Sequence, residues 1–239
     1  MNPFWLAWSF LTILPAPGQK FACSEEFAKS RIWYPAIGLV IGGIWAGAAF
    51  LLRQIHCPTG LQGVGLLAVP LVVTGFLHFD GLLDSADALL APCTPERRLE
   101  ILKDVSVGSF AMGVGGLWLL LTSQILSLNP SCWFLLGLPV VSRGTLLVSI
   151  YLFPYARQVD SSSLSHTTNS FSWRWIVPVL SVIPVFWFFP MESIAVLGIQ
   201  LGVATWAAKR LDGGITGDVY GALLCLSETA ALALHVLRS

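Results

Sequence analysis

Charged residues are scarce in this sequence. Only 11% of its 239 residues are Asp, Glu, Lys or Arg, against roughly 25% in soluble domains, which cover their surface with such side chains. Acidic and basic residues balance at 13 each and no basic block is present, so the chain lacks the positive field that attracts nucleic acid. The low charge argues against a water-soluble globular protein and predicts that lipid surrounds most of the chain.

Cysteine and histidine are also few. The five cysteines are scattered without a Cys-x-x-Cys pair, and none of the four histidines stands at ligand spacing, so we expect neither a disulfide framework nor a zinc site. No basic region precedes the first apolar segment, Phe4 to Leu14, and a cleaved signal peptide therefore fits poorly. We expect residues 1–18 to form an interfacial or re-entrant segment that ends at Pro15 and Pro17.

Apolar residues dominate instead, at 55% of the chain with a mean hydropathy of +0.75. In lipid only α-helices and closed barrels satisfy every backbone N–H and C=O group, and the period-two alternation of barrel strands is missing. The sequence predicts an all-α, polytopic integral membrane protein with one membrane-embedded domain over residues 1–239. Seven stretches approach the roughly 20 residues of a span: about 33–52, 61–79, 107–127, 132–152, 173–190, 191–208 and 215–236. Since the fifth and sixth are short, six spans plus a re-entrant piece is the alternative.

Lysine and arginine are distributed unequally between the two sides of this predicted bundle. Ten of them fall on the side of the amino terminus, only Arg53 and Arg238 fall on the other, and Arg143 lies inside a span. The positive-inside rule then makes the amino-terminal side cytoplasmic. Most acidic residues lie on the same side. We therefore expect a multi-pass protein of the cell (inner or plasma) membrane whose site faces the cytoplasm.

The segment from His78 to Asp87 is the richest in polar side chains. Asp80, Asp84 and Asp87 stand at i, i+4 and i+7, so on a helix they share one face. Like charges at this spacing repel, and near lipid each acid costs more, so such a stripe favours a bound cation. Oxygen ligands suit Mg²⁺, or Mn²⁺, better than zinc or copper. His78, which precedes the stripe, is a candidate to bind phosphate or to orient a carboxylate, and a role outside the site is the alternative.

A second explanation of these acids is that they cap a helix and pair with Arg97, Arg98 or Lys103 in the next connection, although capping explains one Asp better than three. This connection has the pattern of a short amphipathic helix, which either is solvated or binds anionic groups. Asp104, directly before the third predicted span, is a further candidate for the site, because Gly108 lets another group approach the backbone closely.

A glycine-rich stretch opens the last predicted span. Gly213 and Gly214 followed by a helix N-terminus offer backbone N–H groups to a phosphate. Thr216 or Asp218 could equally be an ordinary N-cap. Glu228, two to three turns deeper, is an intramembrane acid, which makes it either a functional residue or a hydrogen-bonded packing residue.

Together these motifs closely resemble the cobalamin synthase family, the adenosylcobinamide-GDP ribazoletransferases of membranes. Five blocks match in order across nearly the whole chain: Phe10–Pro17, His78–Asp87, Glu96–Asp104 with Gly108, Pro154–Arg157, and Gly213–Asp218 with Gly221, Ala222 and Glu228. The sequence departs from the family at Ala88, where Gly is usual, and over residues 158–163, which replace the usual Pro-x-Gly-Leu-Gly.

The resemblance implies an Mg²⁺-dependent transferase that joins adenosylcobinamide-GDP to α-ribazole or its 5′-phosphate and releases GMP. It implies Asp80, Asp84 and Asp87 as metal ligands. Catalytic residues would be His78, Asp104 and Asp218, one of the two aspartates being a further ligand or the general base. The remaining candidates would bind substrate: Lys103, Arg143, Arg157, Gly213, Gly214, Thr216 and Glu228. The expected partners are these substrates and membrane lipid. A homo-oligomer is compatible with the sequence, and nucleic acid is not an expected partner.

Two other classes fit less well. An Mg²⁺-dependent membrane phosphotransferase of the CDP-alcohol type also spaces aspartates along a helix, but its Asp-Gly-x-x-Ala-Arg order is absent. A transporter would place ionisable groups near the midplane, often in broken helices of two related halves. Here most acids lie at the cytoplasmic edge and no repeat is visible, so transport ranks below catalysis.

Overall fold

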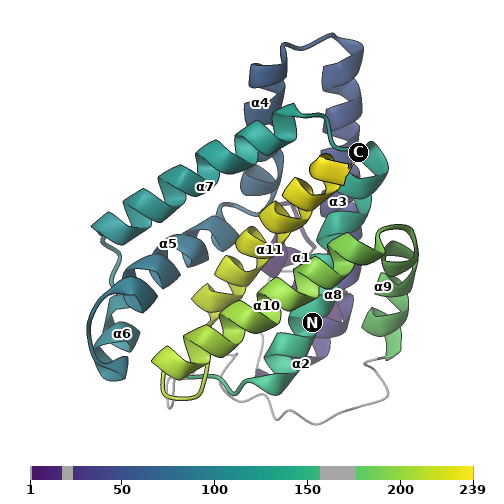
Figure 1. The fold of residues 1–239 in the computed structure, drawn as a ribbon. Helices are drawn as coiled ribbons and strands as arrows, with labels where there is room; N and C mark the ends of the chain where they lie inside the picture. Colours follow the sequence, from purple (N-terminus) through teal and green to yellow (C-terminus); the bar gives the residue numbers. More distant parts are fainter. Residues whose placement is uncertain (1, 18–23, 157–175, 239) are drawn as a thin grey trace.

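The computed structural model describes residues 2–17, 24–156 and 176–238, and the regular elements within these ranges are helices (Figure 1). Five of the helical segments described are long and apolar enough to cross a membrane, and a bent pair would make a sixth. They are Glu26–Gln54, which contains α3 (Tyr34–Gln54), α7 (Ser109–Ser127), α8 (Cys132–Leu152), α10 (Pro190–Arg210) and α11 (Gly217–Arg238). The predicted all-α membrane class is confirmed.

The count of about seven spans is approximate, and two of the predicted spans account for the difference. The stretch 61–79 is divided between α4 (Thr59–Val73) and α5 (Leu77–Leu90), which bend by 92° at a short break. The 15 residues of α4 reach about 22 Å, short of a hydrocarbon core of roughly 30 Å. The stretch 173–190 begins outside the described residues and contains α9 (Ile176–Phe188), of 13 residues.

The break between α4 and α5 has a local cause. Gly75 and Phe76 both adopt left-handed backbone angles, with φ of 59° and 61°, and such angles end a right-handed helix. The break turns the acidic α5 away from the direction of α4, as Figure 1 shows. A straight continuation would have carried three aspartates along the path of an apolar span, which hydrocarbon does not favour.

The amino-terminal segment packs against this break. Helix α1 (Pro3–Leu11) buries Leu6, Ala7 and Leu11, and two of these side chains belong to the large core cluster that also contains residues of α3, α8, α10 and α11. Just beyond α1, the N–H of Ile13 donates to the carbonyl of Val73 at 2.9 Å. The segment therefore supplies a partner for a backbone carbonyl at the end of α4, where the regular helix stops.

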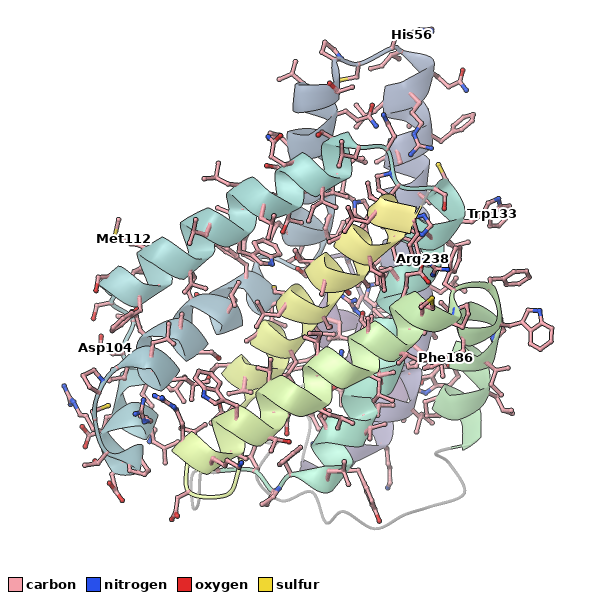
Figure 2. The ribbon with its side chains drawn as sticks, viewed as in Figure 1. His56, Asp104, Met112, Trp133, Phe186 and Arg238 are labelled. Carbon is pink, nitrogen blue, oxygen red and sulfur yellow. The ribbon has the colours of Figure 1, made fainter. Side chains whose placement is uncertain are left out.

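The outer surface of the bundle carries large apolar side chains. Met112 and Trp133 point away from the helices (Figure 2), with 71% and 76% of their surface exposed. Many other leucines, isoleucines and phenylalanines are also exposed on the outward faces of the helices. An apolar exterior of this extent suits contact with lipid tails rather than water.

Small residues let α5 and α11 approach each other closely. A Cβ atom on Gly81 would lie 2.6 Å from the carbonyl oxygen of Asp218, and one on Gly221 would lie 2.8 Å from the carbonyl oxygen of His78. Neither distance leaves room for a side chain, so the two backbones touch at these points. Close helix packing through small residues is the usual arrangement in membranes.

The contact at Gly81 predicts the outcome of a pair of alanine substitutions. Alanine normally stabilises a helix by about 1 kcal/mol relative to glycine, and Gly116 of α7 has open space, with no described atom within 4 Å of its added Cβ. We expect Gly116→Ala to leave the detergent melting temperature unchanged or slightly raised, and Gly81→Ala to lower it because α11 must move. Equal melting temperatures for the two variants would contradict direct packing at Gly81.

Candidate functional site

A pocket of about 270 Å³ lies where α5 and α11 begin, and we call it the carboxylate pocket because Asp80 and Asp218 both line it. Each of these aspartates stands in the first turn of its helix, where the positive end of the helix dipole favours negative charge. His78 also contributes to the wall. The remaining lining comes from separate parts of the chain and includes Phe10, Arg31, Tyr34, Tyr155 and Tyr220. The structure therefore brings the two distant acidic motifs together, as the sequence predicted.

The glycine-rich stretch before α11 positions Asp218. Ile215 and Tyr155 form an isolated parallel bridge, in which the N–H of Ala156 donates to Ile215 and the N–H of Ile215 donates to Pro154, both at 3.0 Å. This bridge joins the Pro154–Arg157 and Gly213–Asp218 motifs, although Arg157 itself lies outside the described residues.

The two glycines of this stretch serve the backbone geometry. Gly213 has a φ of 95°, which favours glycine, and a Cβ on Gly214 would lie 2.7 Å from the Cα of Ala156. The N–H of Gly213 already donates to the carbonyl of Ala208 at 2.8 Å. Neither glycine is among the described residues that line the carboxylate pocket. The structure gives both a turn-forming role, and their contact with phosphate stays a prediction.

Thr216 acts on Asp218 directly. The threonine is fully buried, and its hydroxyl donates to Asp218 Oδ2 at 3.2 Å. A hydroxyl donor held in this way fixes the orientation of the carboxylate. Thr216 therefore positions the carboxylate at the start of α11.

Asp87 has a clear capping role. Its carboxylate accepts hydrogen bonds from the N–H of Gly108 at 2.6 Å and from that of Ala111 at 2.9 Å, at the start of α7. A Cβ on Gly108 would lie 2.6 Å from Asp87 Oδ1, which explains the glycine. The expectation that Gly108 admits another group to the backbone is confirmed, and that group is a carboxylate of the acidic stripe itself.

The acidic stripe as a whole does not form a preassembled metal cage. Within residues 2–17, 24–156 and 176–238, no three His, Cys, Asp or Glu side chains are grouped closely enough to hold a metal ion. Mg²⁺, however, usually takes only one or two protein carboxylates and completes its shell with water and substrate phosphate. Asp80 and Asp218 in one pocket fit that requirement, with Asp84 one turn further along the same helix face.

Asp104 and Lys103 are exposed, and neither is among the described residues that line the carboxylate pocket. Figure 2 shows Asp104 at the edge of the bundle, in the connection between α6 (Pro95–Ile101) and α7. The hydroxyl and the N–H of Ser106 donate to its carboxylate and hold the pKa of Asp104 below its usual value. The general-base role of Asp104 stays a prediction from the sequence.

Two basic residues near α5 contact backbone carbonyls at the end of that helix. Arg98 donates to the carbonyls of Ala88 and Leu89 at 2.6 and 3.0 Å, and Arg210 donates to Leu89 at 2.5 Å. Both guanidinium groups therefore bind the carboxyl-terminal end of α5, where the helix dipole favours positive charge. Arg97 pairs with Glu100 on the surface.

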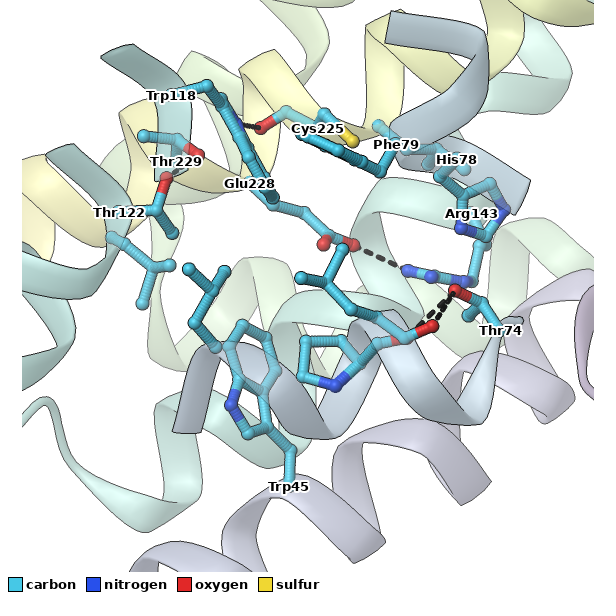
Figure 3. A pocket seen from close by; sticks show the side chains of 15 residues that line it. Trp45, Thr74, His78, Phe79, Trp118, Thr122, Arg143, Cys225, Glu228 and Thr229 are labelled. Atoms are coloured by element: carbon cyan, nitrogen blue, oxygen red, sulfur yellow. Dashed lines mark hydrogen bonds and ion pairs between the residues drawn. The ribbon is translucent and has the colours of Figure 1, made fainter. Parts of the chain in front are cut away.

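Arg143 and Glu228 pair with each other inside the bundle. Arg143 Nη1 and Glu228 Oε1 are 2.5 Å apart, and the hydroxyl of Ser142 donates to the same oxygen at 2.5 Å. Figure 3 shows the pair facing a second cavity of about 30 Å³, the inner cavity, which His78 also lines. Gln200 continues the network by donating to the carbonyl of Ser142 at 2.9 Å. Neither charged residue lines the carboxylate pocket in the described part of the chain, so their placement differs from the predicted contact with substrate.

One residue of the pocket, Arg31, was not among the candidates predicted from the sequence. It is one of the ten basic residues on the amino-terminal side of the predicted bundle. In the structure it is 7% exposed and lines the carboxylate pocket. It precedes α3, in a short 3₁₀ turn (Arg31–Trp33). Its position beside Trp33 and Tyr34 at the start of an apolar run is a weak sequence signal, because such residues are also common at membrane boundaries.

Comparison with known families finds a match to the model described as cobalamin-5-phosphate synthase over residues 3–236. Relatives named adenosylcobinamide-GDP ribazoletransferase include one from Deinococcus radiodurans, 40% identical over 96% of this chain and 84% of the relative. Another, from Desulfitobacterium hafniense, is 37% identical over 95% of this chain and 94% of its own length. A third, from Desulforamulus reducens, is 34% identical over 97% and 95%. No solved structure matches the chain.

Proposed function

Because this chain belongs to the cobalamin-5-phosphate synthase family, we propose that it is a membrane transferase of cobalamin synthesis that joins adenosylcobinamide-GDP to α-ribazole or its 5′-phosphate. A hydroxyl of α-ribazole attacks the phosphorus that carries cobinamide, a new P–O bond forms, and the bond to the leaving GMP breaks. The products are GMP and adenosylcobalamin or its 5′-phosphate. The observation that carries this proposal is the shared pocket of Asp80 and Asp218.

The residues of the carboxylate pocket divide the work of such a transfer. Asp80, with Asp84 one turn along α5 and Asp218 at the start of α11, would hold Mg²⁺, or Mn²⁺, which when bound neutralises charge developing on phosphate oxygens. Asp218, oriented by Thr216, is also the better-placed candidate to accept the proton of the attacking hydroxyl. Asp87 supports the site by anchoring α7 to α5.

The activity can be tested with purified protein. Protein in detergent would be incubated with adenosylcobinamide-GDP, α-ribazole and Mg²⁺, and GMP and the corrinoid product would be measured. We expect one GMP for each corrinoid joined, loss of both products in EDTA, and recovery on adding Mg²⁺ or Mn²⁺. Absence of GMP in the complete mixture, together with release of CMP from a CDP-alcohol, would favour the CDP-alcohol class instead.

We further propose that the protein resides in the cell membrane with the carboxylate pocket facing the cytoplasm, which the ten-to-two distribution of basic residues supports. In a background without native cysteines, Thr94→Cys and Lys209→Cys should react with a membrane-impermeant maleimide only after permeabilisation. Thr59→Cys, at the exposed start of α4 near His56 at the opposite end of the bundle (Figure 2), should react in intact cells. The reverse pattern would invert the topology.

A further inference from the structure

The carboxylate pocket is also lined by residues of different chemistry. They are Arg31 and several aromatic side chains, among them Tyr34, Tyr155 and Tyr220, and we refer to them as the wall of Arg31 and the tyrosines. Phe10 stacks on Tyr34 with ring centroids 6.3 Å apart and planes inclined by 21°. A buried guanidinium among aromatic rings is not needed to hold a cation, since the aspartates supply that chemistry. The wall instead combines an anion-binding group with surfaces on which a flat base can stack.

The size of the pocket limits what can enter it. About 270 Å³ is near the lower end of the roughly 300–1,000 Å³ of ligand pockets. One aromatic base with its sugar is of that size, whereas a corrin macrocycle with its side chains is several times larger. Of the two substrates in the proposed reaction, the smaller nucleoside fits the pocket, and the corrinoid must remain largely outside it.

Arg31 lines the same pocket as the two aspartates. The attacking hydroxyl must reach Asp80 and Asp218, so a phosphate elsewhere on the same small sugar stays within that pocket. Arg31 is 7% exposed there, and a guanidinium forms two parallel hydrogen bonds to a phosphate, a geometry that lysine cannot reproduce. Burial removes competing water and strengthens that interaction.

We propose that the wall of Arg31 and the tyrosines is the subsite for the nucleoside substrate, and that Arg31 determines the preference for the 5′-phosphorylated form over free α-ribazole. This inference rests on the proposed function, because it assigns the parts of that substrate to the parts of the pocket. The aromatic side chains bind the base in both forms of the substrate. Arg31 acts only on the phosphate, so it changes selectivity rather than the transfer step itself.

The test measures kcat/KM separately for α-ribazole 5′-phosphate and for α-ribazole. We expect Arg31→Met to lower kcat/KM for the phosphate by roughly 10- to 100-fold, the usual loss of a hydrogen bond to a charged group, with a change under about threefold for α-ribazole. Arg31→Lys should recover part of the loss. The control is Arg97→Met, which removes the same charge from an exposed surface pair and should leave both values unchanged.

A second variant separates the aromatic part of the wall from Arg31. Tyr155→Leu should raise KM for both forms by a similar factor, about tenfold for one lost stacking contact. If Arg31→Met lowers kcat/KM equally for both substrates, or lowers neither, the assignment of Arg31 is overturned. If Tyr155→Leu affects only one of the two substrates, the assignment of the aromatic side chains is overturned. If the wild-type protein transfers neither form, the proposed function itself fails, which none of these variant results can mimic.

Discussion

Replacing Asp218 with asparagine is expected to lower kcat by about 10³-fold, the central value for loss of a positioned proton acceptor, while the protein remains folded. The amide removes the negative charge with little change in volume. It can still accept the hydroxyl of Thr216, which now donates to Oδ2 at 3.2 Å, so the start of α11 should be preserved. Steady-state GMP release and a melting curve in detergent would measure the two effects separately.

Asp212→Asn is the matched control for this substitution. Asp212 is exposed in the same loop, with a left-handed φ of 59° that asparagine accepts readily, and it is not among the described residues that line the pocket. Its activity should equal that of the wild type. Comparable losses at Asp212 and Asp218 would mean that the loop responds to any change of charge.

The pair Asp80 and Asp218 should also lose activity non-additively. If both carboxylates bind the same ion, Asp80→Asn already removes most of what Asp218 contributes, and the double variant should be little worse than either single variant. Each single variant should also need more Mg²⁺ for its half-maximal rate. Losses that multiply, together with an unchanged Mg²⁺ requirement, would separate the two residues into independent roles.

Hydropathy and charge predicted most of the fold because they depend on transfer between water and lipid, which acts on long stretches of chain. They could not predict the break after Val73. Gly75 and Phe76 are uncharged, and a hydropathy averaged over the length of a span does not respond to the left-handed φ angles of two residues. The predicted span 61–79 therefore crossed a 92° bend. Only Gly75 carried a local sign of it.

The site was predictable to the extent that its residues are costly in lipid. Asp80 and Asp218 were expected in one site because both lie at the cytoplasmic ends of predicted spans and both motifs pair acids with small residues. The structure places the two in one pocket. The role of Asp87 required knowing that α7 begins beside it. The burial of Arg31 required knowing how the turn before α3 packs. Both are tertiary facts that spacing along one helix does not contain.

The pairing of Arg143 with Glu228 is another tertiary contact that spacing along one helix does not predict. It leads to the largest expected effect on stability. Arg143 is almost fully buried, and Glu228 is 13% exposed. Removing one partner of a buried pair costs about 3–5 kcal/mol because the other charge remains without compensation. The two partners differ, however, in how they can respond. A carboxylate can take up a proton and become neutral, whereas a guanidinium keeps its charge.

Glu228→Leu should therefore be the most destabilising variant, because it leaves the Arg143 guanidinium charged in the interior. Arg143→Met should cost less, since Glu228 can protonate and still accept the hydroxyl of Ser142. The double variant Arg143→Met/Glu228→Leu should recover much of the loss, as apolar replacements of buried pairs often do. Unfolding in detergent titrated with denaturant would give this order.

The exposed pair Arg97 and Glu100, with both side chains 64% exposed, provides the comparison. Its double variant Arg97→Met/Glu100→Leu should change stability by under about 1 kcal/mol, because exposed pairs contribute little. A different result would be that Glu228→Leu and Arg143→Met are equally destabilising and that their effects add in the double variant. The two side chains would then act independently, and the charge on Arg143 would not be the reason that Glu228 is needed. If the predicted order holds, the role of Glu228 is to neutralise Arg143 in the apolar interior. Arg143 lines the inner cavity together with His78. Because His78 also lines the carboxylate pocket, the buried pair links the stability of the bundle to that pocket.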